Sequence, residues 1–168
     1  MLRLRQDNVH ILGNGHLVSR CSDYIIYSVE AEKIDRVVAQ FGPSTKLGAI
    51  VGGQTSCKTP EIAAFEKHLP ADVEIVSCHS LHGPGVNPKG QPLVWRLPNT
   101  WFTTMILTVA QVLIKHRASQ KSLDLVEKIL SCLQSKHVYL TAQAHDRITA
   151  DTQAVTHAAF LRSDTLRM

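Results

Sequence analysis

Residues 47–62 read Leu-Gly-Ala-Ile-Val-Gly-Gly-Gln-Thr-Ser-Cys-Lys-Thr-Pro-Glu-Ile, and this stretch decides the fold class. Its apolar beginning, Leu47–Val51, predicts a buried strand that two glycines then end. Thr59 and Pro60 predict the N-cap and the first turn of a helix that runs to about Leu69. A strand that passes through a short turn into a helix is the repeating unit of α/β folds.

The same alternation extends to both sides of this stretch. Asp23–Val29 is rich in β-branched and aromatic residues, which predicts a strand. Glu30–Phe41 carries apolar residues at helical spacing, and Val73–Val76 predicts a further strand. The order strand, helix, strand, helix, strand implies a parallel sheet with helices packed on its faces.

The ends of the chain give weaker patterns. Asn14-Gly15 lies between two short apolar runs, which predicts a β-hairpin near the start of the chain. Residues 122–134 predict an amphipathic helix, 137–141 a short strand and 142–162 a long helix. The chain is therefore expected to change from α/β to mainly helical near residue 140.

Composition excludes several classes of protein. The 168 residues carry a net charge of +4, but the basic residues are scattered and only 5% are aromatic, which argues against nucleic-acid binding. The four cysteines lie far apart, so neither a disulfide framework nor a metal site is expected. Residues 97–114 are uncharged, yet their threonines, Pro98, Asn99 and Gln111 argue against a membrane span. With no apolar signal at the start, a cytoplasmic protein is expected.

Residues 77–84, Ser-Cys-His-Ser-Leu-His-Gly-Pro, hold the leading candidate for chemistry. They are expected to form a loop after the strand Val73–Val76, at the edge of the sheet where α/β folds bind ligands. His79 would suit proton removal from a substrate hydroxyl, because histidine exchanges its proton near neutral pH. The alternative is an ordinary surface histidine, and His82 is expected to be structural.

Two further polar segments are candidates for binding. Gly52, Gly53, Ser56 and Lys58 follow a strand end and precede a helix, where backbone N–H groups can bind an anion, although an ordinary turn would have the same sequence. In the last predicted helix, one face carries polar residues that would be either solvated or the wall of a polar active site; they are Asp146, Gln153 and His157. No Gly-x-Gly-x-x-Gly run follows a first strand, so a complete dinucleotide site cannot be argued.

Four runs, in this order, resemble the arogenate/prephenate dehydrogenase family in its fungal, NADP-dependent form. The resemblance covers roughly residues 8–94 and 113–161. The runs are S-D-Y-I-I-Y-S-V-E-A-E, I-V-G-G-Q-T-S-C-K-T-P-E-I, S-C-H-S-L-H-G-P-G-V-N-P-K-G-Q-P-L-V and H-D-R-I-T-A-D-T-Q-A-V-T-H-A-A-F-L. The combination is specific, whereas any one run alone would be weak.

The resemblance implies oxidative decarboxylation of prephenate to 4-hydroxyphenylpyruvate in tyrosine biosynthesis, with hydride transfer to NADP in a cytoplasmic homodimer. His79 would hydrogen-bond the ring hydroxyl of prephenate, and Ser56 would lie between nicotinamide and substrate. The cofactor-binding set would be Gly52, Gly53, Ser56 and Lys58. The substrate-binding set would be His145, Asp146, Gln153 and His157.

The chain also departs from the family pattern. Ser80 stands where the family has proline and Gly53 where it has an acidic residue, while the first strand and its glycine-rich loop are expected to be missing. The 18 residues 95–112 interrupt the pattern, which suggests a retained intron or a gene-model error. The expected fold is an incomplete Rossmann-like α/β sheet followed by the start of an all-helical dimerisation domain. Its expected segments are 1–94, the insertion 95–112, 113–141 and 142–168.

Two other functions remain open from the sequence alone. One is a catalytically incompetent fragment, because the phosphate-binding loop is absent from the sequence. The other is a different Rossmann-type dehydrogenase that acts on a hydroxy acid and uses the same strand-end loops.

Overall fold

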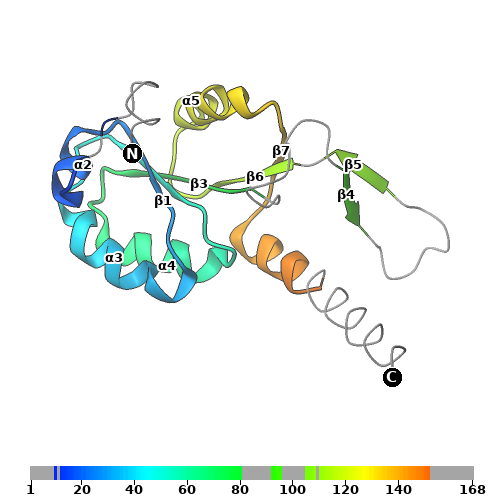
Figure 1. The fold of residues 1–168 in the computed structure, drawn as a ribbon, viewed down its shortest axis with the longest axis horizontal. Coiled ribbons are helices and arrows are strands. Elements are labelled where there is room, and N and C mark those ends of the chain that lie inside the picture. The colour runs from blue at the N-terminus through cyan, green and yellow to red at the C-terminus, as the bar shows by residue number, and fades with distance from the viewer. Residues whose placement is uncertain (1–9, 11, 81–91, 96–104, 109, 152–168) are drawn as a thin grey trace.

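The computed structural model of the chain describes residues 10, 12–80, 92–95, 105–108 and 110–151. Its main sheet has five strands in the order β1-β2-β3-β6-β7 (Figure 1). They are β1 (Tyr24–Tyr27), β2 (Ile50–Gly53), β3 (Glu74–Ser80), β6 (Ala110–Lys115) and β7 (Lys136–Tyr139). β1, β2 and β3 are parallel, β6 runs antiparallel to β3, and β7 is parallel to β6. The predicted α/β fold is thus confirmed, but β6 and β7 run opposite to the three parallel strands, which the sequence did not indicate.

Helices cover both faces of this sheet, which gives three layers (Figure 1). The chain forms α2 (Gly15–Cys21), α3 (Ile34–Phe41), α4 (Lys58–His68), α5 (Gln120–Leu130) and a further helix over residues 142–151, here called the C-terminal helix. Short 3₁₀ turns occupy Ala31–Lys33, Gly42–Ser44 and Ser131–Leu133. β4 (Pro92–Trp95) and β5 (Met105–Thr108) pair as a separate antiparallel ribbon.

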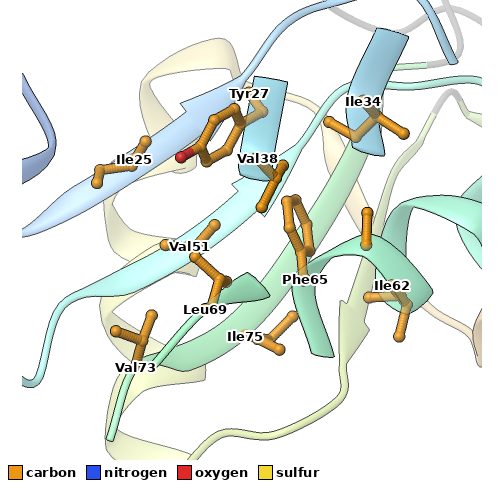
Figure 2. Packing of buried hydrophobic residues seen from close by; sticks show 11 residues of the cluster. Ile25, Tyr27, Ile34, Val38, Val51, Ile62, Phe65, Leu69, Val73 and Ile75 are labelled. Atoms are coloured by element: carbon orange, nitrogen blue, oxygen red, sulfur yellow. The ribbon is translucent and has the colours of Figure 1, made fainter. Parts of the chain in front are cut away.

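Two hydrophobic clusters fix the layers. On one face, Val38 of α3 and Phe65 of α4 pack on Val51 and Ile75 of the parallel strands, all fully or almost fully buried (Figure 2). On the other face, the apolar stripe of α5 packs on Ile50, Val76 and Leu113; its buried members are Leu123, Val126 and Leu130. The two clusters pack on opposite faces of β2 and β3, so they fix the positions of the carboxyl ends of these strands.

The predicted hairpin near residue 14 is wrong, because the chain forms α2 there. The Asn14 side chain accepts a hydrogen bond from the backbone of His16, which caps the helix. A Cβ at Gly15 would come within 2.7 Å of the Phe41 ring, so the close approach of α2 to α3 requires glycine. Asparagine followed by glycine serves here as a helix start rather than as a turn between strands.

Two other element boundaries differ from the sequence-based expectation. α4 begins at Lys58 and its N-cap is Cys57 rather than Thr59. β3 continues to Ser80, because β6 pairs with it as far as Ser80 opposite Gln111, so His79 lies in the strand and not in a loop after it. Residues 81–84 and 152–162, which belong to the predicted loop and helix, lie outside the described residues. No helix in the described ranges is long and apolar enough to cross a membrane.

Gln111 in β6 is a polar residue buried in this core. It is 1% exposed, and its side-chain amide meets no oxygen or nitrogen partner among the residues described. The Cys78 thiol interacts with this amide, but sulfur is a weak hydrogen-bond partner. A buried polar group without an adequate partner costs about 1–3 kcal/mol. We therefore expect Gln111→Leu to raise the free energy of unfolding by about 1 kcal/mol or more, measured by urea denaturation.

The matched control is Gln120→Leu, because the Gln120 amide is exposed and hydrogen-bonded to Lys115 and Asp124. That change is expected to alter stability by no more than about 0.5 kcal/mol. A loss of stability in Gln111→Leu would mean that the buried amide has a strong partner in solution.

Candidate functional site

The candidate site lies at the edge where β1, β2 and β3 end. Because these strands are parallel, their carboxyl ends meet there, and the turn 54–57 between β2 and α4 lies beside the end of β3. Ser56 is exposed on this turn and His79 is half-buried at the end of β3. The structure thus brings the two residues predicted to be catalytic to one edge of the sheet.

Gln54, which the sequence analysis did not single out, holds the turn against β3. Its side-chain nitrogen donates to the Cys78 thiol at 3.2 Å, and its side-chain oxygen accepts from the backbone N–H of Ser80 at 3.0 Å. These two bonds flank His79 along the strand. Burial raises the pKa of the Cys78 thiol, so this sulfur is a neutral structural partner rather than a reactive thiolate.

Lys58 points inward, not toward the open edge. Its ammonium is fully buried and donates to the backbone oxygens of Gly53 and Cys78 at 2.9 and 2.7 Å. It also forms an ion pair with Glu61 at 3.0 Å and bonds to the Ser77 hydroxyl at 3.1 Å. Lys58 therefore joins the ends of β2 and β3 to the first turn of α4.

Glu61 completes this buried cluster, which we call the Lys58–Glu61 cluster; it also includes Thr55 and Ser77. The Glu61 carboxylate accepts from the backbone and hydroxyl of Thr55, at 3.1 and 2.6 Å, and from the Ser77 hydroxyl. Burial lowers the pKa of Lys58, while the Glu61 carboxylate acts in the opposite direction. A buried charge pair of this kind needs its additional hydrogen bonds to offset the cost of desolvation.

The two glycines at the end of β2 are required by this packing. A Cβ at Gly52 would lie 2.3 Å from the backbone oxygen of Val76, and one at Gly53 would lie 2.2 Å from the Glu61 carboxylate. A side chain at either position would push β2 away from β3 or displace Glu61. These glycines, predicted to follow the strand, instead form its last two residues, and contacts within the chain are sufficient to explain them.

The residues predicted to bind substrate come close to His79 from the C-terminal helix. His145 is 1% exposed, and its Nε2 lies 2.8 Å from Nδ1 of His79. Asp146 is the next residue along this helix, and its carboxylate caps the N-terminus of α4. It accepts hydrogen bonds from the backbone N–H groups of Lys58 and Thr59 at 2.6 and 2.7 Å. Gln153 and His157 lie outside the described residues.

The electrostatics keep His79 neutral and Asp146 ionised. Burial, the Lys58 ammonium and His145 lower the pKa of His79 to about 4. Burial would raise the pKa of Asp146, but the hydrogen bonds from Lys58, Thr59 and His145 outweigh it and lower this pKa to about 2. At neutral pH the edge therefore presents an uncharged imidazole supported by a carboxylate.

Comparison with known sequences finds two similar fungal enzymes. No protein-family model matches the sequence. The chain is 62% identical over 151 residues to the probable prephenate dehydrogenase (NADP+) of Schizosaccharomyces pombe and 57% identical over 152 residues to the prephenate dehydrogenase (NADP+) of Saccharomyces cerevisiae. Each match takes in 90% of this chain but only 31% and 30% of the relative, so the chain spans about a third of their length.

The fold agrees with a solved structure of the same kind. The prephenate dehydrogenase of Aquifex aeolicus superimposes with a TM-score of 0.66 at 17% identity, over 92% of this chain and 53% of that one. At this level of identity the match concerns the fold. It supports the Rossmann-like arrangement of the sheet that was expected from the sequence.

Proposed function

We propose that this chain is a segment of an NADP-dependent prephenate dehydrogenase and carries the proton-accepting edge of its active site, because it is 62% and 57% identical to the two fungal relatives of that kind. The substrate would be prephenate and the product 4-hydroxyphenylpyruvate, on the way to tyrosine. The observation that carries the proposal is the position of His79 at the carboxyl end of β3, on the same edge of the sheet as the exposed Ser56 and 2.8 Å from the buried His145. We further propose that the complete protein is a cytoplasmic homodimer.

Two residues on this edge would take part in the reaction, His79 and Ser56. His79 accepts the proton of the ring hydroxyl, and the electrons of that O–H bond form the carbonyl as the C–H bond breaks. NADP, when bound, would supply the hydride acceptor for this carbon. The bond to the ring carboxylate then breaks, carbon dioxide leaves, and the electrons of that bond complete the aromatic ring, while the former carbonyl oxygen takes back a proton to give the phenol. Ser56 contributes a hydrogen bond that orients the reacting groups.

The predicted cofactor-binding residues fit the nicotinamide end of a dinucleotide in part. Ser56 is exposed on the turn after β2, so its hydroxyl can reach a ligand. Gly52 and Gly53 end β2 just before this turn and would act indirectly, because the space that a Cβ would need is filled by Val76 and Glu61. Lys58 would act indirectly, because its ammonium is fully engaged inside the Lys58–Glu61 cluster.

We also propose that residues 95–112 are an insertion in the enzyme's sequence. Without them, Leu93-Val94 would run directly into Leu113, and Leu93 would take the register position of Gln111 opposite Ser80. An apolar residue would then replace the buried amide that lacks an oxygen or nitrogen partner among the described residues. The ribbon of β4 and β5 would no longer form, because the insertion supplies its second strand.

The proposal is tested with a chimeric enzyme that contains this chain. The matching segment of the Saccharomyces cerevisiae relative is replaced by residues 10–151 of this chain, with and without residues 95–112, and NADPH formation is followed with prephenate as substrate. We expect turnover from the version that lacks 95–112. No turnover with prephenate from a folded version would contradict the proposed function and would favour an incompetent fragment. Turnover of another hydroxy acid, but not of prephenate, would favour a different dehydrogenase.

A further inference from the structure

A row of hydrogen bonds leads from the C-terminal helix to the end of β3. Oδ1 of Asp146 lies 2.9 Å from Nδ1 of His145, and Nε2 of His145 lies 2.8 Å from Nδ1 of His79. The two imidazole rings meet edge to face, with centroids 5.0 Å apart and planes at 66°. Within the described residues, these contacts connect His79 to one carboxylate through one buried histidine.

The donors and acceptors in this row are fixed by its carboxylate end. Asp146 is ionised and can only accept hydrogen bonds, so Nδ1 of His145 must donate to it. In a neutral His145, Nε2 is then the acceptor, and it accepts from Nδ1–H of His79. A neutral His79 with its proton on Nδ1 carries a free electron pair on Nε2.

We propose that Asp146 and His145 determine which ring nitrogen of His79 acts as the base, and that the three residues form a proton relay. They hold the proton of His79 on Nδ1, leave Nε2 as the acceptor, and receive the charge when Nε2 is protonated. The relay step rests on the proposed function. The hydroxyl O–H bond breaks as Nε2–H of His79 forms, and Nδ1–H of His79 breaks as Nε2–H of His145 forms, so the positive charge ends on His145.

The relay explains how an imidazole in this position can act near neutral pH. Among the described residues, the charged and titratable groups that act on His79 are Lys58 of α4 and His145 and Asp146 of the C-terminal helix. Burial and the Lys58 ammonium disfavour a positive charge on His79 itself. On His145 the same charge would be paired with the Asp146 carboxylate at 2.9 Å, which stabilises it. His145 and Asp146 are thus positioning residues that act through His79.

The test is the tautomer of His79 in this 168-residue chain, measured without substrate by ¹H–¹⁵N NMR of ¹⁵N-labelled histidine at pH 7.5. The His79 and His145 signals are identified by their loss in His79→Asn and His145→Asn. We expect both rings to carry the proton on Nδ1 and to have a bare Nε2. Asp146→Asn should give a mixture of tautomers at both rings, whereas the exposed Asp124→Asn, remote from the row, should change neither.

A His79 ring that carries its proton on Nε2 in the unsubstituted chain would overturn the proposal. So would an Nδ1–H tautomer that persists unchanged in a folded Asp146→Asn variant, because the carboxylate would then not set the direction. If Asp146→Asn does not fold, the tautomers of the unsubstituted chain still decide the question. Because the NMR measurement needs no turnover, an inactive chimeric enzyme with the expected tautomers would count against the proposed function alone.

Discussion

Replacing His79 by asparagine is expected to lower kcat with prephenate by about 10²- to 10⁴-fold, the usual contribution of a positioned general base. Asparagine keeps a polar side chain of similar reach, so it can still contact the ring hydroxyl. It cannot accept a proton at neutral pH, however, and the hydride would have to leave while the hydroxyl keeps its hydrogen. The measurement is steady-state NADPH formation by the chimeric enzyme that lacks residues 95–112, with the His79→Asn variant and the unsubstituted chimera compared in parallel.

The control is His116→Asn, which changes the same residue type at the opposite end of the sheet. His116 is about half exposed, pairs with Glu66 at 2.9 Å, and its backbone N–H bonds to Ile75 near the start of β3. Its replacement should leave kcat within about twofold, because it touches nothing at the reacting edge. A His79→Asn enzyme as fast as this control would exclude His79 as the base. A rise in KM with unchanged kcat would assign it to binding only.

The sequence was sufficient for the features that depend on local pattern. Ile25, Val51 and Ile75 lie in short apolar runs, and each run forms a strand of the parallel sheet. Ile34 and Val38 recur at helical spacing and face the core from α3. The rule that ligands bind where parallel strands end then placed His79 and Ser56 at one edge from the sequence alone.

The features that the sequence did not reveal depend on contacts between distant residues. The carboxylate that caps α4 comes from Asp146, 88 residues after Lys58, so local capping rules placed the N-cap wrongly at Thr59. The pairing of β6 with β3 keeps His79 in a strand, and nothing near residue 79 indicates that partner. His145 was predicted to contact substrate, and its hydrogen bond to His79 has no signature in spacing.

The sequence also did not reveal that the charge of Lys58 is buried and paired inside the protein. A lysine in a glycine-rich turn before a helix is typical of a ligand-binding cation, and the sequence analysis interpreted it so. Glu61 lies one helical turn further on, and only the packing of α4 against β2 and β3 makes the pair internal. Glu61 lies three residues after Lys58, and this spacing was the one feature of the sequence that could indicate an ion pair. Exposed ion pairs on helices have the same spacing, so it does not show that the pair is buried.

Loss of Glu61 is expected to have the largest effect on stability of any single change at this edge. Glu61→Ala would leave the Lys58 ammonium fully buried without its counter-ion, and would also remove the acceptor of the Thr55 and Ser77 hydroxyls. Breaking a buried ion pair from one side costs about 3–5 kcal/mol. Urea unfolding of the 168-residue chain, followed by circular dichroism, should detect this as a large fall in the midpoint.

Glu66→Ala is the matched control, because Glu66 lies on the same helix and forms ion pairs with His116 and Arg117 at the surface. Exposed pairs contribute at most about 1 kcal/mol, so this variant should remain close to the unsubstituted chain. Combining Glu61→Gln with Lys58→Met removes both charges while keeping a hydrogen-bonding group near Thr55, and should recover part of the loss. If Glu61→Ala costs no more than Glu66→Ala, the Lys58–Glu61 cluster does not hold the strand ends together. Ser56 and His79 would then be positioned by the Gln54, Asp146 and His145 contacts and by the pairing of β6 with β3.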